Sequence, residues 1–398
     1  MTLESAICPH LRRDRTLPKS TPANYVPPFP VFSARFDEDM QDVAMVMLGA
    51  VSSEDNTTLD YDALVPLDRL LELGSPLHGH RTLCTSTDPQ TLRQTRAWKA
   101  WWPSRRDFED WRLSSGFAAW FAGEEREKED IGWFVEAIFP SMDRFETVFS
   151  NAASLEGAAV LSSHMSGAIE EHGYWGSARD RFAVGQHDPM SAVRSACPVA
   201  GLAVRAEGPQ KASGSPRPQQ ISSKRVIVPG QHNLCVIHSG QDWSQMTGSD
   251  RDLYLHTLHP VLERGMSFLA HQKVPLSQRE TSAAQKERRT YGCYDCRFMD
   301  HLDASSLESS LSKSFGLAYF DSLSSLEAWA REHKTHLDIF NGFFKYATET
   351  QGKGDLRLWH EICVLKEDQQ YYEYINCPPG TGMYVGLAAR VNTSTDLV

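Results

Sequence analysis

The chain has 398 residues and lacks the features of several large protein classes. No run of about 18–20 apolar residues occurs, so no membrane-spanning helix is expected. There is no block of Lys or Arg, and the formal net charge is −11. Nucleic acids and anionic membranes are therefore poor partners, because both attract a concentrated cationic surface. Neither GxGxxG nor GxxxxGK[ST] is present, so a dinucleotide site and a P-loop have no sequence support.

Cysteine pairs with a recognisable spacing are also scarce. Eight cysteines are spread over the chain, and only Cys293 and Cys296 form a CxxC. Without a second pair, this motif does not indicate structural zinc. The first 30 residues contain Arg and Lys but no apolar core of a secretory signal. We therefore expect reduced thiols and a cytoplasmic protein.

Composition divides the chain into an arm and two halves. Residues 206–225 are rich in Pro, Gly, Ser and Gln, which is typical of a linker or surface insertion, and residues 272–290 are similar. We therefore expect an N-terminal arm (1–29), a first half (30–205), a linker at 206–225 and a second half (226–392).

A weak internal repeat supports two related halves. The pattern apolar-Glu-x-Trp occurs at 108–111 and again at 326–329, an offset of 218 residues. Each copy follows a helix-start signal, a serine with an acidic residue three positions later, at Ser104 and at Ser324. The pattern predicts one helix in each half at equivalent places.

The stretch HKTHLDIFNGFF (333–344) has two histidines followed by an apolar run. His336 is either a core or capping histidine or a metal ligand, and His333, one turn away, competes with it for the second role. The apolar residues that follow suit a porphyrin face better than a bare zinc ion, which needs several more ligands nearby. In the repeat, His336 matches Ala118, so only the second half carries this histidine.

Other polar groups have ordinary explanations when each is taken alone. The stretch IEEHGYWGSARDRF (169–182) is consistent with a surface turn held by Arg–Asp pairs. Ser239 suits a turn or a helix cap, and Glu146 suits a solvated face. His360 lies in an apolar strand, where an imidazole can transfer protons near neutral pH. An HExxH zinc motif fails there because residue 364 is Val.

Together these segments resemble the aldoxime dehydratases, the haem-containing lyases that include phenylacetaldoxime dehydratases. The resemblance spans roughly residues 25–385 and follows the order of the family. The stretches that carry it are FET (145–147), IEEHGYWGSARDRF (169–182), SGQDW (239–243), SLEAWAREHKTHLDIF (325–340), LWHE (358–361) and YINCPPGTGM (374–383).

The resemblance implies both a fold and a reaction. The fold is α+β, with tandem ferredoxin-like repeats related to dimeric α+β barrels and packed as a homodimer. The reaction is the dehydration of an aldoxime to a nitrile, R–CH=N–OH to R–C≡N plus water, with the substrate nitrogen bound to ferrous haem b.

The resemblance also implies roles for individual residues. His336 becomes the proximal haem ligand, and Ser239 becomes the hydroxyl that holds the oxime oxygen. His360 becomes the acid–base residue. Glu146 and Arg181 become the pair that orients His360 and polarises the site.

Several alternatives stay open from the sequence. Arg179 is a second candidate for the arginine. A haem monooxygenase or haem-degrading protein of the α+β barrel class also binds haem through one histidine, and a haem carrier or sensor would need no chemistry of its own. The substrate is either an aryl-alkyl aldoxime such as phenylacetaldoxime or an aliphatic one.

Overall fold

The structure is a computed structural model that describes most of the chain. The described residues are 3–53, 55, 57–73, 80–89, 91–191, 219–220, 224–271, 291–305, 311–351 and 354–384. The expected insertion at 272–290 and nearly all of the expected linker at 206–225 lie outside them. Within the described ranges, no helix combines the length and apolar character needed to cross a membrane.

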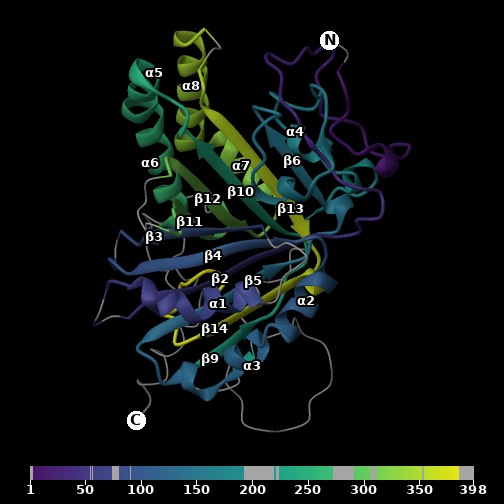
Figure 1. The fold of residues 1–398 in the computed structure, drawn as a ribbon. Coiled ribbons are helices and arrows are strands. Elements are labelled where there is room, and N and C mark those ends of the chain that lie inside the picture. The colour runs from purple at the N-terminus through teal and green to yellow at the C-terminus, as the bar shows by residue number, and fades with distance from the viewer. Residues whose placement is uncertain are drawn as a thin grey trace, which may run out of the picture.

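The described residues form a mixed α/β fold around one curled antiparallel sheet of twelve strands (Figure 1). Two further strands, β1 (Ala34–Arg35) and β7 (His164–Met165), pair separately. The large sheet contains β2 (Ala44–Ser52), β3 (His80–Thr87), β4 (Gln94–Trp102), β5 (Ile131–Ile138), β6 (Phe145–Phe149), β8 (Gln219–Gln220), β9 (Arg225–Val228), β10 (Leu234–Asp242), β11 (Cys293–Leu302), β12 (Lys313–Phe320), β13 (Arg357–Leu365) and β14 (Gln370–Ile375).

The helices belong to two groups, one for each half of the chain. The first half contributes α1 (Val65–Leu73), α2 (Arg105–Ser114), α3 (Phe117–Ala122) and α4 (Ser177–Arg181). The second half contributes α5 (Gly248–Leu253), α6 (His259–Ala270), α7 (Leu323–Glu332) and α8 (Lys334–Glu349). Figure 1 shows α5 to α8 beside β10, β11 and β12, whereas α1 to α3 lie with β2, β4 and β5.

Each half contains the same order of elements. The first half runs β2, α1, β3, β4, α2 with α3, and β5, and the second runs β10, α5 with α6, β11, β12, α7 with α8, and β13. The strands also lie in the same order, β5-β2-β4-β3 in one half and β13-β10-β12-β11 in the other. The two sets join edge to edge where β3 pairs with β11.

The two halves exchange the strand that follows each set. β6 comes after β5 in the chain but pairs with β13, and β14 comes after β13 but pairs with β5. The core inside the curled sheet therefore contains side chains from both halves, including Phe134, Phe315, Trp359 and Tyr372. This exchange brings first-half residues to the edge of the second half.

The helices of the repeat are capped at equivalent positions. Ser104 caps α2 by accepting a hydrogen bond from the Asp107 amide, and Ser322 caps α7 by accepting one from the Ser325 amide. The expected cap at Ser324 is wrong, because Ser324 already lies in the first turn of α7. Ser104 and Ser322 are 218 residues apart, the offset of the repeat.

A buried carboxylate links strands from both halves inside the curled sheet. Glu136 on β5 forms an ion pair with Arg297 on β11 and accepts hydrogen bonds from the hydroxyls of Tyr319 (2.9 Å) and Tyr374 (2.8 Å). Arg297 also pairs with Asp295 at 2.9 Å. A charge inside a core is tolerated only when its partners are supplied, so Glu136 and Arg297 depend on each other.

Glu136→Leu is expected to destabilise the protein by about 3–5 kcal/mol, because it leaves the Arg297 charge buried without its main partner. Denaturant-induced unfolding of the purified protein measures this change. Asp110→Ala is the control, because it breaks only the exposed 3.8 Å pair with Arg106 and should cost about 0.5 kcal/mol or less. Equal losses in the two variants would contradict the assigned role of Glu136.

Candidate active site

Ser239 and His360 lie opposite each other on neighbouring strands. In the register of β10 and β13, Ser239 pairs with His360, so both side chains point to the same face of the sheet. Directly opposite residues on antiparallel strands have Cβ atoms about 4.5–5.5 Å apart. Gly316 is the partner of Ser239 on the other neighbouring strand, β12, and adds no side chain that would cover the serine hydroxyl.

The face that carries these two residues is the one covered by the second-half helices. Ile362, two positions after His360, packs with Leu262 and Met266 of α6 and Trp329 of α7. Side chains alternate along a strand, so His360 and Ile362 share a face. The hydroxyl of Ser239 and the ring of His360 therefore point into the space between the sheet and these helices.

Glu146 and Arg181 join His360 through a buried ion pair. Arg181 donates from Nε and Nη2 to the two carboxylate oxygens of Glu146, at 2.7 and 3.0 Å. Nη2 also lies 3.1 Å from His360 Nε2. The side chains of Glu146 and Arg181 are almost fully buried, whereas that of His360 keeps 30% of its exposure. Burial raises the pKa of Glu146, but Arg181 and His360 outweigh it and hold the carboxyl below its ordinary value.

This arrangement offers His360 a partner in each protonation state. In the neutral tautomer with its proton on Nδ1, Nε2 accepts the hydrogen bond from Arg181. When the ring is protonated, the same atom has the Glu146 carboxylate 3.4 Å away as an acceptor. Among the described residues Nδ1 has no assigned hydrogen bond, so it is the nitrogen available to a bound molecule. Such a ring can hold or release a proton without rearrangement of its neighbours.

Arg179 points to a different place. It pairs with Glu327 of α7 at 2.8 Å and donates to Ser324 and to the Pro189 carbonyl. Of the two arginines considered from the sequence, the structure brings Arg181 to His360 and uses Arg179 to attach α4 to α7.

His336 lies half-buried in the first turn of α8. The chain leaves α7 at His333, whose backbone is extended, and His333 then caps α8 by accepting from the Thr335 amide. The His333 ring also stacks on Phe268 with centroids 3.8 Å apart, so both its Nδ1 and one face of the ring already have partners. The expected single helix therefore breaks at His333, and the two histidines have different surroundings.

The surroundings of His336 fit an axial haem ligand. Burial lowers the pKa of its ring to about 4 and outweighs the opposing effect of the Ala330 backbone, so the ring is neutral, and its buried Nδ1 makes no hydrogen bond of good geometry in the described part of the chain. A neutral imidazole with an unpartnered nitrogen is suited to bind iron. The apolar residues that follow along α8 are only half-buried, which leaves apolar surface for a porphyrin: Leu337, Ile339, Phe340, Phe343 and Phe344.

A second polar cluster lies behind the site and was missed from the sequence. His238 and Glu361 are the immediate neighbours of Ser239 and His360, and they face the opposite side of the sheet. His238 Nδ1 lies 2.7 Å from Glu361 Oε1, and His238 Nε2 contacts the ammonium group of Lys99 on β4. All three are buried. Residues 238 and 361 are 123 positions apart, so no local signal in the sequence reveals their contact.

Comparison with known proteins decides the family. A family model described as haem-containing dehydratase matches residues 53–383. The chain belongs to this family. Haem is accordingly its cofactor, in agreement with the environment of His336.

Relatives named as aldoxime dehydratases match almost the whole chain. The aliphatic aldoxime dehydratase of Pseudomonas chlororaphis is 35% identical over 96% of this chain and 97% of its own length, and that of Rhodococcus erythropolis is 34% identical with the same coverage. The phenylacetaldoxime dehydratase of a Bacillus species is 26% identical over 92% of this chain and 93% of its own.

A solved structure of similar length has the same fold. A crystal structure of an aldoxime dehydratase in complex with butyraldoxime superimposes with a TM-score of 0.77 at 33% identity, covering 96% of each chain. The family expected from the sequence is confirmed, and the expected α+β class is confirmed to the extent that the fold mixes helices with a curled antiparallel sheet.

Glu361 is expected to make the stability of the fold depend on pH. Burial raises its pKa to about 7 from the ordinary 4.5, so the folded state binds this proton more tightly than the unfolded chain. Its contribution is full below about pH 4.5 and is lost as the pH rises through about 7. The melting temperature of Glu361→Gln should therefore fall less over this range than that of the unmodified protein.

The control for this measurement is Glu124→Gln, which changes an exposed carboxylate on the surface. It should reproduce the pH profile of the unmodified protein. Parallel profiles for all three proteins would contradict the raised pKa of Glu361.

Proposed function

We propose that the protein dehydrates aldoximes to nitriles at haem, with His336 as the proximal ligand and His360 as the acid–base residue. The observation that carries this proposal is the arrangement of His360, which contacts Arg181 and lies opposite Ser239 on the face covered by the helices that include His336. The names of the relatives support the same reaction. A haem carrier or a monooxygenase gives no reason for a serine beside the histidine.

Each residue has a distinct task in this reaction. The Ser239 hydroxyl holds the oxime oxygen. His360 donates the proton from Nδ1 to that oxygen as the N–O bond breaks, which turns hydroxide, a poor leaving group, into water. The ring is then neutral with its remaining proton on Nε2, toward the Glu146 carboxylate, and Nδ1 accepts the proton released from carbon, so the enzyme returns to its starting state. General acid–base help of this kind contributes about 10²–10⁴-fold to a rate.

Arg181 and Glu146 keep His360 ready for both steps. The Glu146 carboxylate, 3.4 Å from Nε2, can accept from the Nε2 proton in both steps, and Arg181 holds that carboxylate with two hydrogen bonds. His336 would hold the haem, which in the ferrous state would supply electron density that weakens the N–O bond of the oxime.

We propose aliphatic aldoximes as the first substrates to test. The aliphatic aldoxime dehydratases are 34–35% identical to this chain, against 26% for the phenylacetaldoxime dehydratase. The solved relative that binds butyraldoxime supports the same choice.

We also propose that the halves at 30–205 and 226–392 are ferredoxin-like units, that two copies form a homodimer and that the protein is cytoplasmic. The common β-α-β-β-α-β order and the common strand order support the first point. The family resemblance supports the second, and light scattering should give twice the chain mass of 44.7 kDa. Five cysteines in the described ranges are free thiols, as expected in a reducing compartment: Cys8, Cys84, Cys235, Cys363 and Cys377.

The reaction is tested with dithionite-reduced protein under argon. Adding butyraldoxime should shift the visible haem spectrum, which returns as butyronitrile accumulates in the gas chromatogram. His360→Asn should keep its haem and the initial shift but form nitrile about 10²–10⁴-fold more slowly. A spectrum that responds to neither aliphatic nor aryl-alkyl aldoximes would contradict the proposal.

His336→Ala is expected to lose haem, because it removes the axial ligand, and His333→Ala is the control. His333 is the nearest other histidine, but its ring already caps α8 and stacks on Phe268. Haem per chain, measured as the pyridine haemochrome, should fall severalfold in the first variant and stay near one in the second. The reverse result would make His333 the ligand.

A further inference from the structure

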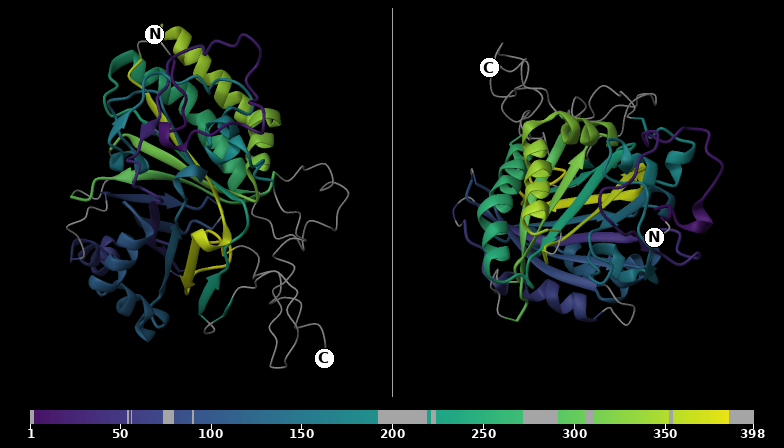
Figure 2. Two further views of the ribbon diagram at one scale, coloured as in Figure 1. Left: turned by 90° about the vertical axis from the view of Figure 1, so that its right-hand side faces the viewer. Right: turned by 90° about the horizontal axis from the view of Figure 1, so that it is seen from above.

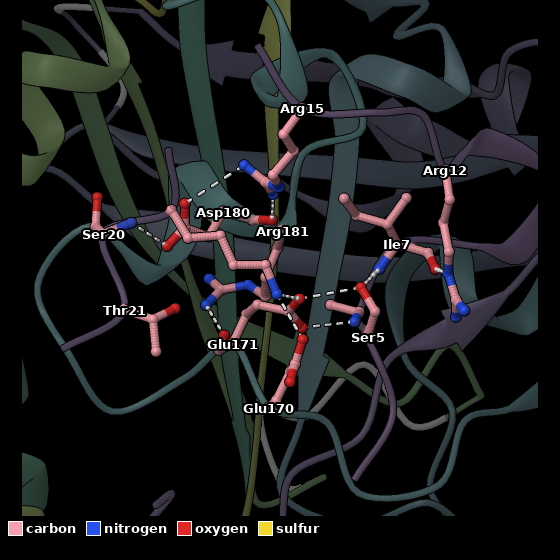
Figure 3. Close-up of polar contacts among 12 residues, drawn as sticks. Ser5, Ile7, Arg12, Arg15, Ser20, Thr21, Glu170, Glu171, Asp180 and Arg181 are labelled. Atoms are coloured by element: carbon pink, nitrogen blue, oxygen red, sulfur yellow. Dashed lines mark hydrogen bonds and ion pairs between the residues drawn. The ribbon is translucent and has the colours of Figure 1, made fainter. Parts of the chain in front are cut away.

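Arg181 lies in a segment with little regular structure of its own. Its helix, α4, has five residues, and the surrounding segment 167–188 is mostly turns. The N-terminal arm, here residues 3–33, runs along this segment (Figure 3), and Figure 2 shows the arm at the same end of the molecule as α8. The position of Arg181 therefore depends on contacts with a distant part of the chain.

Glu171 is the main attachment point of the arm. The residue is completely buried, and its carboxylate accepts three hydrogen bonds from the arm: from the Ser5 hydroxyl (3.0 Å), the Ala6 amide (2.7 Å) and the Lys19 ammonium group (2.8 Å). Burial raises the pKa of this carboxyl, but Lys19 and Ala6 outweigh it and hold the pKa below its ordinary value. Glu171 is thus a buried anion whose hydrogen-bond donors come from the arm.

The main chain of Glu171 holds the guanidinium of Arg181. Arg181 Nη1 donates to the Glu171 carbonyl at 3.0 Å and to the Ser177 hydroxyl at 3.2 Å. Nε and Nη2 of the same guanidinium donate to the Glu146 carboxylate, and Nη2 also contacts His360. Nη1 of Arg181 is therefore held by Glu171, whose own side chain is held by the arm. Nη2 of the same guanidinium contacts His360, the proposed acid–base residue.

The neighbouring residue reinforces this attachment. Asp180 is buried, and its carboxylate accepts from the Ser20 amide at 2.8 Å and from the Tyr174 hydroxyl at 2.9 Å. The Asp180 carbonyl accepts from Arg15 at 2.8 Å. The arm thus contacts the backbone or side chain of residues on both sides of the segment that ends in Arg181 (Figure 3).

We propose that Glu171 is a positioning residue: by anchoring the N-terminal arm with its carboxylate and Arg181 with its carbonyl, it sets the distance between Arg181 and His360. This inference rests on the proposed role of His360. The charged groups that face Arg181 are Glu146 and Glu171, and His172 beside them is neutral, because burial and the Arg181 charge lower its pKa to about 4. A small displacement of Arg181 changes its hydrogen bond to His360, and misplacement by about 1 Å can cost about 10²-fold in rate.

Glu170 provides a matched control for Glu171. It is the adjacent residue, has the same side chain and also pairs with Lys19, but it is exposed, with 46% of its side chain accessible, and has no contact with Arg181. Glu171→Gln keeps the size of the side chain, removes its charge and replaces one of the two oxygens that accept from the arm by an NH2 group. Both variants lose one ion pair with Lys19, so the comparison isolates the buried anchor.

The test uses haem-loaded full-length protein and four variants: Glu171→Gln, Glu170→Gln, Arg181→Lys and the double variant Glu171→Gln/Arg181→Lys. Glu171→Gln should lower kcat about tenfold or more with haem content unchanged, and it should shift the alkaline limb of the kcat/KM profile against pH, because the proposed reaction starts from protonated His360. Glu170→Gln should stay within twofold with an unshifted profile.

The double variant decides whether Glu171 acts through Arg181. If it does, Glu171→Gln adds less than twofold to the loss caused by Arg181→Lys, because the interaction to be positioned is already gone. The inference would be overturned if the kcat losses of the two single variants multiplied in the double variant. It would also be overturned if the pH profile of Glu171→Gln equalled that of Glu170→Gln. Either result would leave the proposed reaction intact. If Arg181→Lys alone is fully active, both this inference and the proposed role of Arg181 fall, but nitrile formation still tests the reaction itself.

A milder variant covers the case in which Glu171→Gln does not fold. Lys19→Met removes one of the three arm donors from a partly exposed position and leaves the other two. It should produce a smaller shift of the same pH limb, whereas Lys128→Met, at a 4.0 Å surface pair with Glu124, should not. An unshifted limb in Lys19→Met would then overturn the inference.

Discussion

The ion pair between Glu146 and Arg181 sets the strictest requirement in this structure. Both side chains are almost fully buried, and a buried charge without its partner costs several kcal/mol. Glu146 lies on β6 and Arg181 on α4, both in the first half of the chain, whereas His360 lies on β13 in the second. The pair can reach His360 only because β6 leaves its own half and forms the edge next to β13. The exchange of strands is therefore a requirement of the site as well as a feature of the fold.

The same exchange explains why two similar halves yield one site. In the second half, the half-buried apolar face of α8 and the neutral His336 leave room for a porphyrin. In the first half, the corresponding helix α3 has six residues, and the space between the helices and the sheet is filled by aromatic side chains that pack on one another. These are Trp98, Trp102, Phe108, Trp111, Phe117, Phe121, Trp133 and Phe139. A close-packed core of this kind has no space for a cofactor.

The sequence could predict what depends on local signals and family motifs. It predicted related helices in each half, the apolar run after His336 and Arg181 as the preferred arginine, which the structure brings to His360. It placed the cap of α7 two residues late and missed the break at His333, because serines and histidines near a helix start compete for the same amide groups. It gave no sign of the contacts between the arm and Glu171, which are more than 150 positions apart, since such contacts depend on tertiary packing.

The buried cluster behind the site suggests how the register of the two central strands is held. His238 and Glu361 bond to each other on one face of β10 and β13, and Ser239 and His360 face each other on the opposite side. A slip of one residue would exchange the two faces, placing Glu361 under the helices and His360 against Lys99 inside the curled sheet. Such a slip would leave the buried His238 ring without the Glu361 carboxylate that it contacts. The polar cluster thus makes the wrong register costly, and the active pair on the other face is aligned as a consequence.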